Sequence, residues 1–110
     1  MLDRLTTNLS VGSRQVQRCD EYRTLIIDTI VVKFTPMQYC VLTSLLNGQT
    51  ISDIDLIRTV FGSQAELCDY KRLRKHIDKA RVKLRSAGLD ICRMPKRGYV
   101  LVEGVECKEA

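Results

Sequence analysis

One segment constrains the fold more than any other, because it is both periodic and strongly cationic. Between Asp69 and Ala87, apolar residues recur at steps of three and four, the spacing that lines up one side of an α-helix. Gly88 follows as a helix-ending residue. The segment predicts a long helix with a broad polar surface and one narrow apolar stripe, made of Leu73, Ile77, Ala80, Leu84 and Ala87.

The positive charge of the protein is concentrated in this predicted helix. Of the 18 basic and 13 acidic residues in the chain, eight basic and two acidic ones lie between positions 69 and 87. The remainder therefore holds 10 basic and 11 acidic residues, a net charge of −1 against +5 for the whole chain. A charged helix face is often only a solvated surface. Charge of one sign beside an almost neutral remainder instead indicates a surface that binds phosphates.

A shorter, well-capped helix is predicted earlier in the chain. Thr35 is a suitable capping residue, Pro36 occupies the first helical position and Gln38 completes a capping box. The helix is expected to end near residues 47–48, an Asn-Gly pair, which is a C-terminal signal.

A second helix is predicted to begin after Ser52, with Asp55 in its first turn, and to end at Gly62. Because only residues 47–51 link it to the first helix, the two helices must pack as neighbours. The cationic helix follows after a loop over residues 63–68. This order is that of a helix-turn-helix motif.

Short strands are predicted before the helices. Runs with β-branched residues indicate antiparallel strands over residues 11–18, 23–27 and 30–33, joined by tight turns. Residues 1–10 show no such pattern and are expected to form a lead-in.

A hairpin is predicted after the cationic helix. Residues 90–94 and 99–102 read as two strands around a Pro-Lys-Arg-Gly tip, so the tip carries Lys96 and Arg97. The remaining residues, 103–110, are expected to form a polar tail.

The sequence offers no support for catalysis or metal binding. The five cysteines include no CxxC pair, and the only histidine, His76, has no second ligand at metal spacing. We expect reduced thiols, with Cys40 buried as a small apolar residue, and neither a metal nor another cofactor. Because no Gly-rich phosphate loop or nucleophile beside a base is present, the protein is not expected to be an enzyme.

Four segments, in this order, resemble the signatures of OmpR/PhoB-type winged helix-turn-helix DNA-binding domains. They are Phe34–Tyr39 (FTPMQY), Ser52–Gly62 (SDIDLIRTVFG), His76–Leu84 (HIDKARVKL) and Pro95–Leu101 (PKRGYVL). The last segment resembles the wing of the ToxR/CadC branch in particular. Together with the strand pattern, the resemblance covers about residues 11–102.

Two residues depart from the common pattern of these domains. Lys96 stands where the first glycine of a Gly-x-Gly-Tyr wing is found, a feature that the ToxR/CadC-like wing shares. Asp78 stands where relatives often have a basic residue. Arg74 and Arg81 lie four residues before it and three after it, so an ion pair on the helix surface is the expected explanation. An acid near phosphates is expected to lower affinity for DNA.

The resemblance implies an α+β fold, a winged helix-turn-helix with an N-terminal antiparallel sheet, a three-helix core and a C-terminal β-hairpin wing. It implies sequence-specific binding of double-stranded DNA for transcriptional regulation. The third helix would lie in the major groove and the wing at the minor groove or backbone. Further implied partners are RNA polymerase, at the loop 63–68, and a second copy or tandem domain on repeated half-sites.

Nine residues are assigned to the DNA interface by their positions in the resemblance and on the helix. Lys75 and Lys79 are the candidates for base edges, because they point away from the apolar stripe. Arg72, His76 and Arg81 are the candidates for phosphates. The full set, with two wing cations, is Lys71, Arg72, Arg74, Lys75, His76, Lys79, Arg81, Lys96 and Arg97.

An alternative from another class stays open: the same fold serving as a protein-interaction module that does not read DNA. The cellular location follows from what the sequence lacks. No apolar run approaches the ~20 residues that cross a bilayer, and the N-terminus has no secretory signal. We expect a cytoplasmic protein, or the cytoplasmic part of a membrane-anchored regulator, with no membrane contact by this segment.

Overall fold

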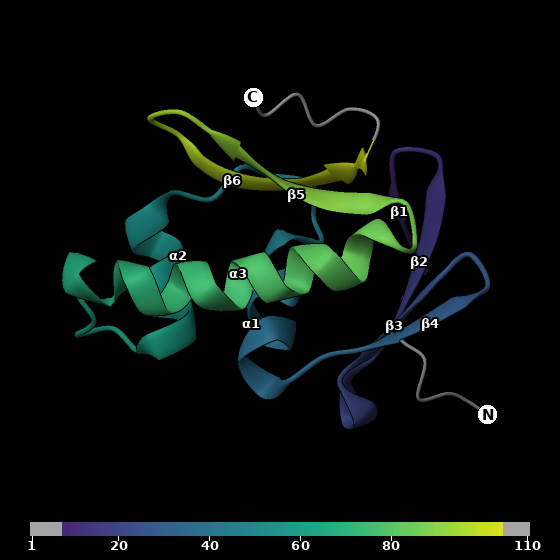
Figure 1. The fold of residues 1–110 in the computed structure, drawn as a ribbon, viewed down its shortest axis with the longest axis horizontal. Coiled ribbons are helices and arrows are strands. Elements are labelled where there is room, and N and C mark those ends of the chain that lie inside the picture. The colour runs from purple at the N-terminus through teal and green to yellow at the C-terminus, as the bar shows by residue number, and fades with distance from the viewer. Residues whose placement is uncertain (1–7, 105–110) are drawn as a thin grey trace.

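The computed structural model describes residues 8–104, without the side chains of Asn8 and Leu67. The chain begins with a four-stranded antiparallel sheet in sequence order (Figure 1), made of β1 (Asn8–Val11), β2 (Arg14–Cys19), β3 (Thr24–Ile27) and β4 (Ile30–Lys33). One side of this sheet carries the buried residues, because side chains alternate along each strand. Those residues include Val16, Leu25, Ile27 and Val32.

The single strand predicted over residues 11–18 is two strands in the structure. Gly12, with φ of 61°, and Ser13 turn the chain, so that β1 pairs with β2 in register Val11↔Arg14. Strand β1 also takes in three residues of the predicted lead-in, from Asn8 onward. A turn of only two residues hardly interrupts the strand pattern in the sequence. The one sign of it is the glycine, which tolerates the positive φ that the turn requires. Residues 1–7 of the lead-in lie outside the described residues.

The helices begin where their capping residues predict. Helix α1 (Pro36–Leu45) has a complete capping box, in which Thr35 Oγ1 accepts from the Gln38 amide at 3.3 Å and the Thr35 amide donates to Gln38 Oε1 at 3.2 Å. Helix α2 (Asp53–Phe61) is capped by Ser52, whose Oγ accepts from the Asp55 amide at 3.2 Å. Both N-termini are therefore fixed by local sequence.

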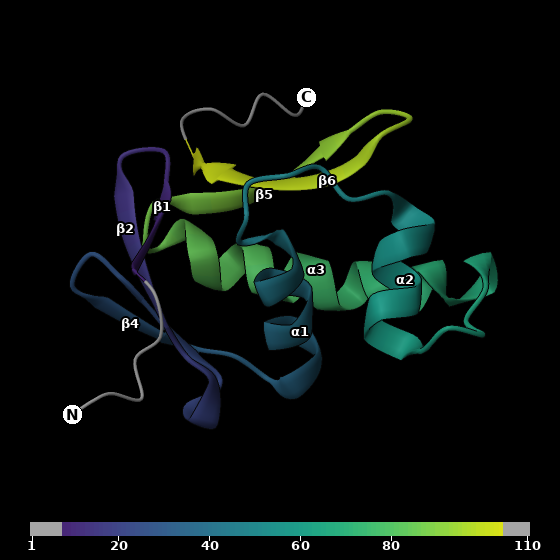
Figure 2. The same ribbon diagram turned by 180° about the vertical axis from the view of Figure 1, so that it is seen from behind.

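Helix α3 (Tyr70–Arg85) is the predicted cationic helix, and it follows a short 3₁₀ turn, η2 (Leu67–Asp69). Its predicted apolar stripe is buried throughout, with Leu73, Ala80 and Leu84 fully inaccessible. The stripe packs against α1 and against the first strand of the hairpin. Figures 1 and 2 show α3 on one side of the molecule and α1 and α2 behind it.

The predicted hairpin is formed by β5 (Leu89–Met94) and β6 (Gly98–Glu103), paired in antiparallel register. It lies along α3 and reaches from the four-stranded sheet toward α2 (Figures 1 and 2). The end of β6 takes in Glu103, the first residue of the predicted tail; residues 105–110 of that tail lie outside the described residues.

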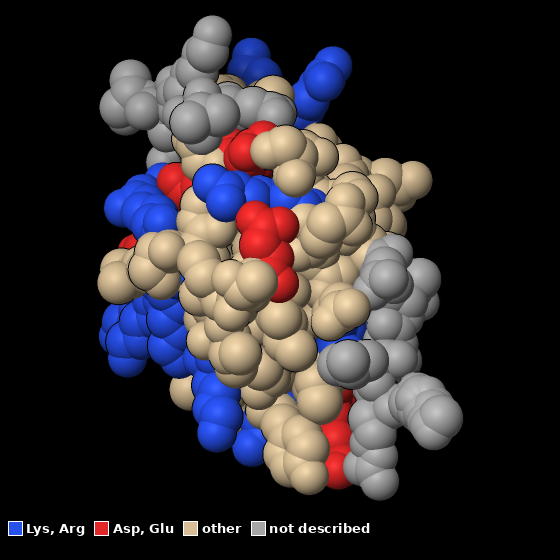
Figure 3. All heavy atoms as spheres, turned by 90° about the vertical axis from the view of Figure 1, so that its right-hand side faces the viewer, with Lys and Arg blue, Asp and Glu red and all other residues tan. Residues whose placement is uncertain are grey.

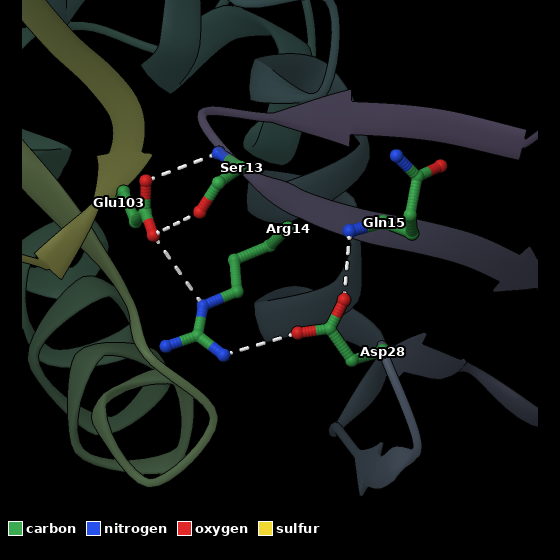
Figure 4. Close-up of polar contacts among 5 residues, drawn as sticks. All are labelled: Ser13, Arg14, Gln15, Asp28 and Glu103. Atoms are coloured by element: carbon green, nitrogen blue, oxygen red, sulfur yellow. Dashed lines mark hydrogen bonds and ion pairs between the residues drawn. The ribbon is translucent and has the colours of Figure 1, made fainter.

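A polar network joins the N-terminal sheet to the end of the hairpin (Figure 4). Glu103 accepts hydrogen bonds from the Ser13 amide at 3.0 Å and the Ser13 hydroxyl at 2.6 Å, and its carboxylate lies 3.5 Å from Arg14 Nε. Arg14 also donates to Asp28 at 3.0 Å, while Asp28 accepts from the Gln15 amide. Two turns of the sheet are thereby fastened to the strand that ends the hairpin.

This network makes part of the stability dependent on pH. The hydrogen bonds from Ser13, and the nearby charge of Arg14, hold the pKa of Glu103 below its usual value. A carboxyl whose pKa is lowered by folding stabilises the protein above its usual pKa, and that contribution is lost as pH falls through the lowered value.

We therefore predict that Glu103→Gln reduces the acid sensitivity of the fold. Between about pH 6 and about pH 3, the melting temperature should fall less for this variant than for the wild type. Glu66→Gln, which changes an exposed glutamate outside the network, is the matched control and should follow the wild type. Parallel curves for the wild type and Glu103→Gln would show that the network carries no pH-dependent stability.

Candidate nucleic-acid interface

The outer surface of α3 presents most of the predicted cations. Five of them are exposed, whereas His76 and Arg81 are half-buried at the edges of the helix. The exposed residues are Lys71, Arg72, Arg74, Lys75 and Lys79. Figure 3 views the molecule from the right-hand side of Figure 1 and shows lysine and arginine atoms gathered along its left edge. That edge is the front of Figure 1, where α3 lies.

The central cations of this surface have no acidic partner. Among the described residues, no ion pair or hydrogen bond involves the side chains of Lys71, Arg74, Lys75 or Lys79. Like charges at such spacing on one helix repel each other, so the surface is held at an energetic cost. An arrangement of this kind is suited to a polyanion that supplies the missing negative charge.

One rim of the surface is ordered by the aromatic ring of Phe61, at the end of α2. The Arg72 guanidinium lies 4.4 Å from the centre of this ring and pairs with Asp69 at 3.1 Å. The His76 ring lies 6.2 Å from the same ring. Burial and the charges of Lys79 and Arg72 lower the pKa of His76, which favours its neutral imidazole. A neutral imidazole has one nitrogen that donates and one that accepts a hydrogen bond.

The other rim is ordered by a buried carboxylate on β5. Asp90 pairs with Arg81 at 2.9 Å and with Arg85 at 3.3 Å. Burial alone would raise the pKa of Asp90, but the hydrogen bonds and charge of Arg81, with that of Arg85, hold it below its usual value. The Arg81 side chain is only 18% exposed. Sequence reasoning did not single out Asp90, because its partners become neighbours only when the hairpin packs on α3.

The expected ion pair of Asp78 with Arg74 and Arg81 is wrong. Arg81 turns toward Asp90, and no described residue pairs with the Asp78 carboxylate. Spacing along a helix shows which side chains of that helix can meet. It does not reveal that a carboxylate on another element, here Asp90 on β5, competes for the arginine. Asp78 remains exposed on the outer surface of α3.

The tip of the hairpin presents the last two predicted cations. Lys96 and Arg97 are both exposed. The Arg97 amide donates to the Met94 carbonyl at 2.9 Å, which closes a tight turn with Pro95 as its second residue. Lys96 occupies the third position with φ of 65°, where glycine is usual. A left-handed lysine costs about 1–2 kcal/mol, so the missing glycine noted in the sequence has a real conformational cost.

Three contacts fasten the hairpin to the helices. The backbones of Ile51 and Tyr99 exchange two hydrogen bonds of 2.9 Å, just before α2 begins. The hydroxyls of Tyr70 and Tyr99 lie 2.7 Å apart, which joins the start of α3 to β6. Arg93 Nη2 lies 3.6 Å from Oδ2 of Asp53, which is in the first turn of α2. The two strands on either side of the tip are therefore fastened to the start of α2 and of α3.

The arrangement of the sheet, the three helices and the fastened hairpin decides the fold. The chain has the winged helix-turn-helix fold. Helices α2 and α3 are its helix-turn-helix pair, and the β5–β6 hairpin is its wing. The predicted α+β class and three-helix core are confirmed.

Solved structures share this winged helix-turn-helix fold. The DNA-binding domain of E. coli CadC superposes with a TM-score of 0.65 and 20% sequence identity, over 90% of this chain and 94% of that one. The DNA-binding domain of the response regulator AdeR, in complex with an intercistronic region, gives a TM-score of 0.62 and 15% identity, over 94% and 98%. The sequence itself matches no family model and no curated protein.

The cysteines of the winged helix-turn-helix domain differ from expectation in one respect. Cys92, on β5, is buried, whereas Cys40 is half-buried beside the carbonyl of Thr59. Cys40 lies at the margin of the contact between α1 and α2, which a helical pattern alone does not resolve. Cys107 lies outside the described residues.

The described residues contain neither a metal-binding cluster nor a membrane-spanning helix. In residues 8–104, no three His, Cys, Asp or Glu side chains come together as they would around a metal ion. Within the same range, every helix is too short or too polar to span a membrane.

The close approach of the wing to α2 predicts a specific requirement for Gly98. A Cβ atom there would lie 1.9 Å from the Ile51 carbonyl oxygen, and φ is 123°. Gly98→Ala should therefore destabilise the domain by more than the ~1–3 kcal/mol of backbone strain alone. Gly62→Ala is the matched control, because φ is 109° there but no atom lies within 4 Å. Equal losses in the free energy of unfolding for both variants would show that the approach of the two backbones does not matter.

Proposed function

We propose that this winged helix-turn-helix domain binds double-stranded DNA in a sequence-specific manner and thereby regulates transcription. Helix α3 lies in the major groove, and the wing tip contacts the minor groove or the backbone beside it. The observation that carries the proposal is the row of α3 cations that pair with no described acid, together with two exposed cations at the tip of a hairpin fastened to α2 and α3. The α3 cations are Lys71, Arg74, Lys75 and Lys79, and those at the tip are Lys96 and Arg97. The fold shared with the DNA-binding domains of CadC and AdeR supports it.

The contacts divide into two classes by position. Lys75 and Lys79, on the outermost line of α3, reach base edges, where major-groove patterns distinguish all four base pairs. Arg72 and His76, ordered by Phe61 at one rim, contact phosphates. Arg81 contacts phosphate at the opposite rim, where it also carries the ion pair with Asp90. Lys71 and Arg74 complete the helix contacts.

Further partners follow from the same proposal. RNA polymerase contacts the loop over residues 63–68, and a second copy or tandem domain occupies a repeated half-site. The DNA-binding domain of AdeR is in complex with an intercistronic region, which supports a DNA target for the fold but bears on neither of these two partners. The protein, or the part that carries this domain, then acts in the cytoplasm, where the DNA lies.

The division of contacts predicts two different mutational signatures. Lys75→Ala and Lys79→Ala should lower affinity for a selected site more than for random duplexes, because base contacts carry the specificity. The double variant Lys96→Ala, Arg97→Ala should lower affinity for both kinds of duplex alike, since phosphate contacts do not read sequence. Fluorescence anisotropy with labelled duplexes of both kinds measures the two effects.

Lys33→Ala is the matched control for these variants, because it removes an exposed lysine from β4 in the N-terminal sheet. It should change neither affinity. Equal losses on selected and random duplexes for both sets of variants would contradict the division of contacts.

A further inference from the structure

Two residues on the outer line of α3 are not cations. Val82 has an exposed fraction of 68%, the largest among the exposed large hydrophobic side chains. It lies nine residues after Leu73, about two and a half turns at 3.6 residues per turn, so it points directly away from the buried stripe. Asp78 lies one turn before Val82 on the same surface and is also exposed.

Neither side chain has a place in the buried core. The Asp78 carboxylate pairs with no described residue, although Arg74 and Arg81 are within helical reach. Val82 is 68% exposed, outside the buried core, and valine forms helices less well than lysine or glutamine. The chemistry of the two side chains is also wrong for phosphate, because a carboxylate is repelled by phosphate and an isopropyl group cannot donate to it.

We propose, on the basis of the proposed function, that Asp78 and Val82 read bases in the major groove. Asp78 accepts a hydrogen bond from the exocyclic amino group of a cytosine, and Val82 packs against the C5 methyl group of a thymine. The two residues are about 6 Å apart along the helix axis, so the bases read are one or two steps apart. The pair thus sets the specificity of the C-terminal half of α3.

Base chemistry explains why Asp78 selects cytosine. A carboxylate only accepts hydrogen bonds. In the major groove guanine presents two acceptors, and adenine presents an acceptor beside its amino group, whereas cytosine presents an amino donor alone. Arg74 and Lys75 lie four and three residues before Asp78 on the helix surface, and their charges offset the repulsion between its charge and the DNA backbone.

Val82 prefers thymine because its side chain can make only apolar contacts. Its side chain has no donor or acceptor, and the thymine methyl group is the one apolar feature that a base displays in the major groove. Burying that methyl group against Val82 removes two exposed apolar surfaces from water. The preference is for thymine over cytosine or deoxyuridine, both of which lack the methyl group.

The test is selection of bound sites from a random duplex library, performed with the wild-type chain, Asp78→Asn and Asp78→Ala. The wild type should select a cytosine at one position by about 5- to 150-fold over other bases. Asp78→Asn should move this preference to adenine, whose N6 and N7 an asparagine amide matches. Asp78→Ala removes the same charge but should leave the position without preference, so it separates base reading from a general gain in affinity.

The second arm of the test removes single thymine methyl groups from the DNA. Replacing each thymine of the selected site by deoxyuridine in turn should lower the affinity of the wild type about fourfold at one position, the effect of one buried methyl group. In Val82→Ala this loss should be smaller. Both positions are exposed, and melting curves should show all variants to be folded.

The outcomes separate this inference from the proposed function. A wild-type chain that selects a site whose bases do not change in Asp78→Asn, and which tolerates deoxyuridine at every thymine, would overturn the inference and leave DNA reading intact. A wild-type chain that selects no site at all would overturn both.

Discussion

The burial of one edge of α3 is the constraint on which the rest of the structure depends. Leu73, Ile77 and Leu84 are packed against α1 and the wing, and this fixes the rotation of the helix about its axis. Every outward residue of α3 is placed by that rotation, including the unpaired lysines and the exposed Asp78. The same packing brings Arg81 against Asp90, so the packing of the core also positions the edge of the cationic surface.

Charges in this domain are neutralised at the rims of the cationic surface and left unpaired at its centre. Asp69 and Asp90 form ion pairs with arginines at the two rims of the cationic surface. Asp53 forms an ion pair with Arg93 on the wing. These ion pairs join separate elements or hold a side chain at a helix end. They therefore position the cationic surface without neutralising the charge at its centre. The charge of the central lysines is left without a partner among the described residues.

The sequence predicted what depends on neighbours along the chain. The capping box of Thr35 and Gln38 and the period of the α3 stripe are local, and both are confirmed. The turn at Gly12 was missed because two residues barely interrupt a strand pattern. The pairing of Arg81 with Asp90 was missed because it needs the wing to fold onto α3. The assignment of individual residues to bases or phosphates stays a prediction, because it depends on a duplex as well as on the chain.

The dependence of duplex affinity on salt tests the central claim most directly. If the cationic surface of α3 and the wing tip neutralise about six phosphates, log affinity should fall linearly with log salt with a slope of about −5. Between about 50 and 200 mM salt the affinity should then drop by roughly a thousandfold. An affinity that hardly changes over this range, or a protein that ignores duplexes even in dilute buffer, would contradict the account and favour a domain that binds protein instead.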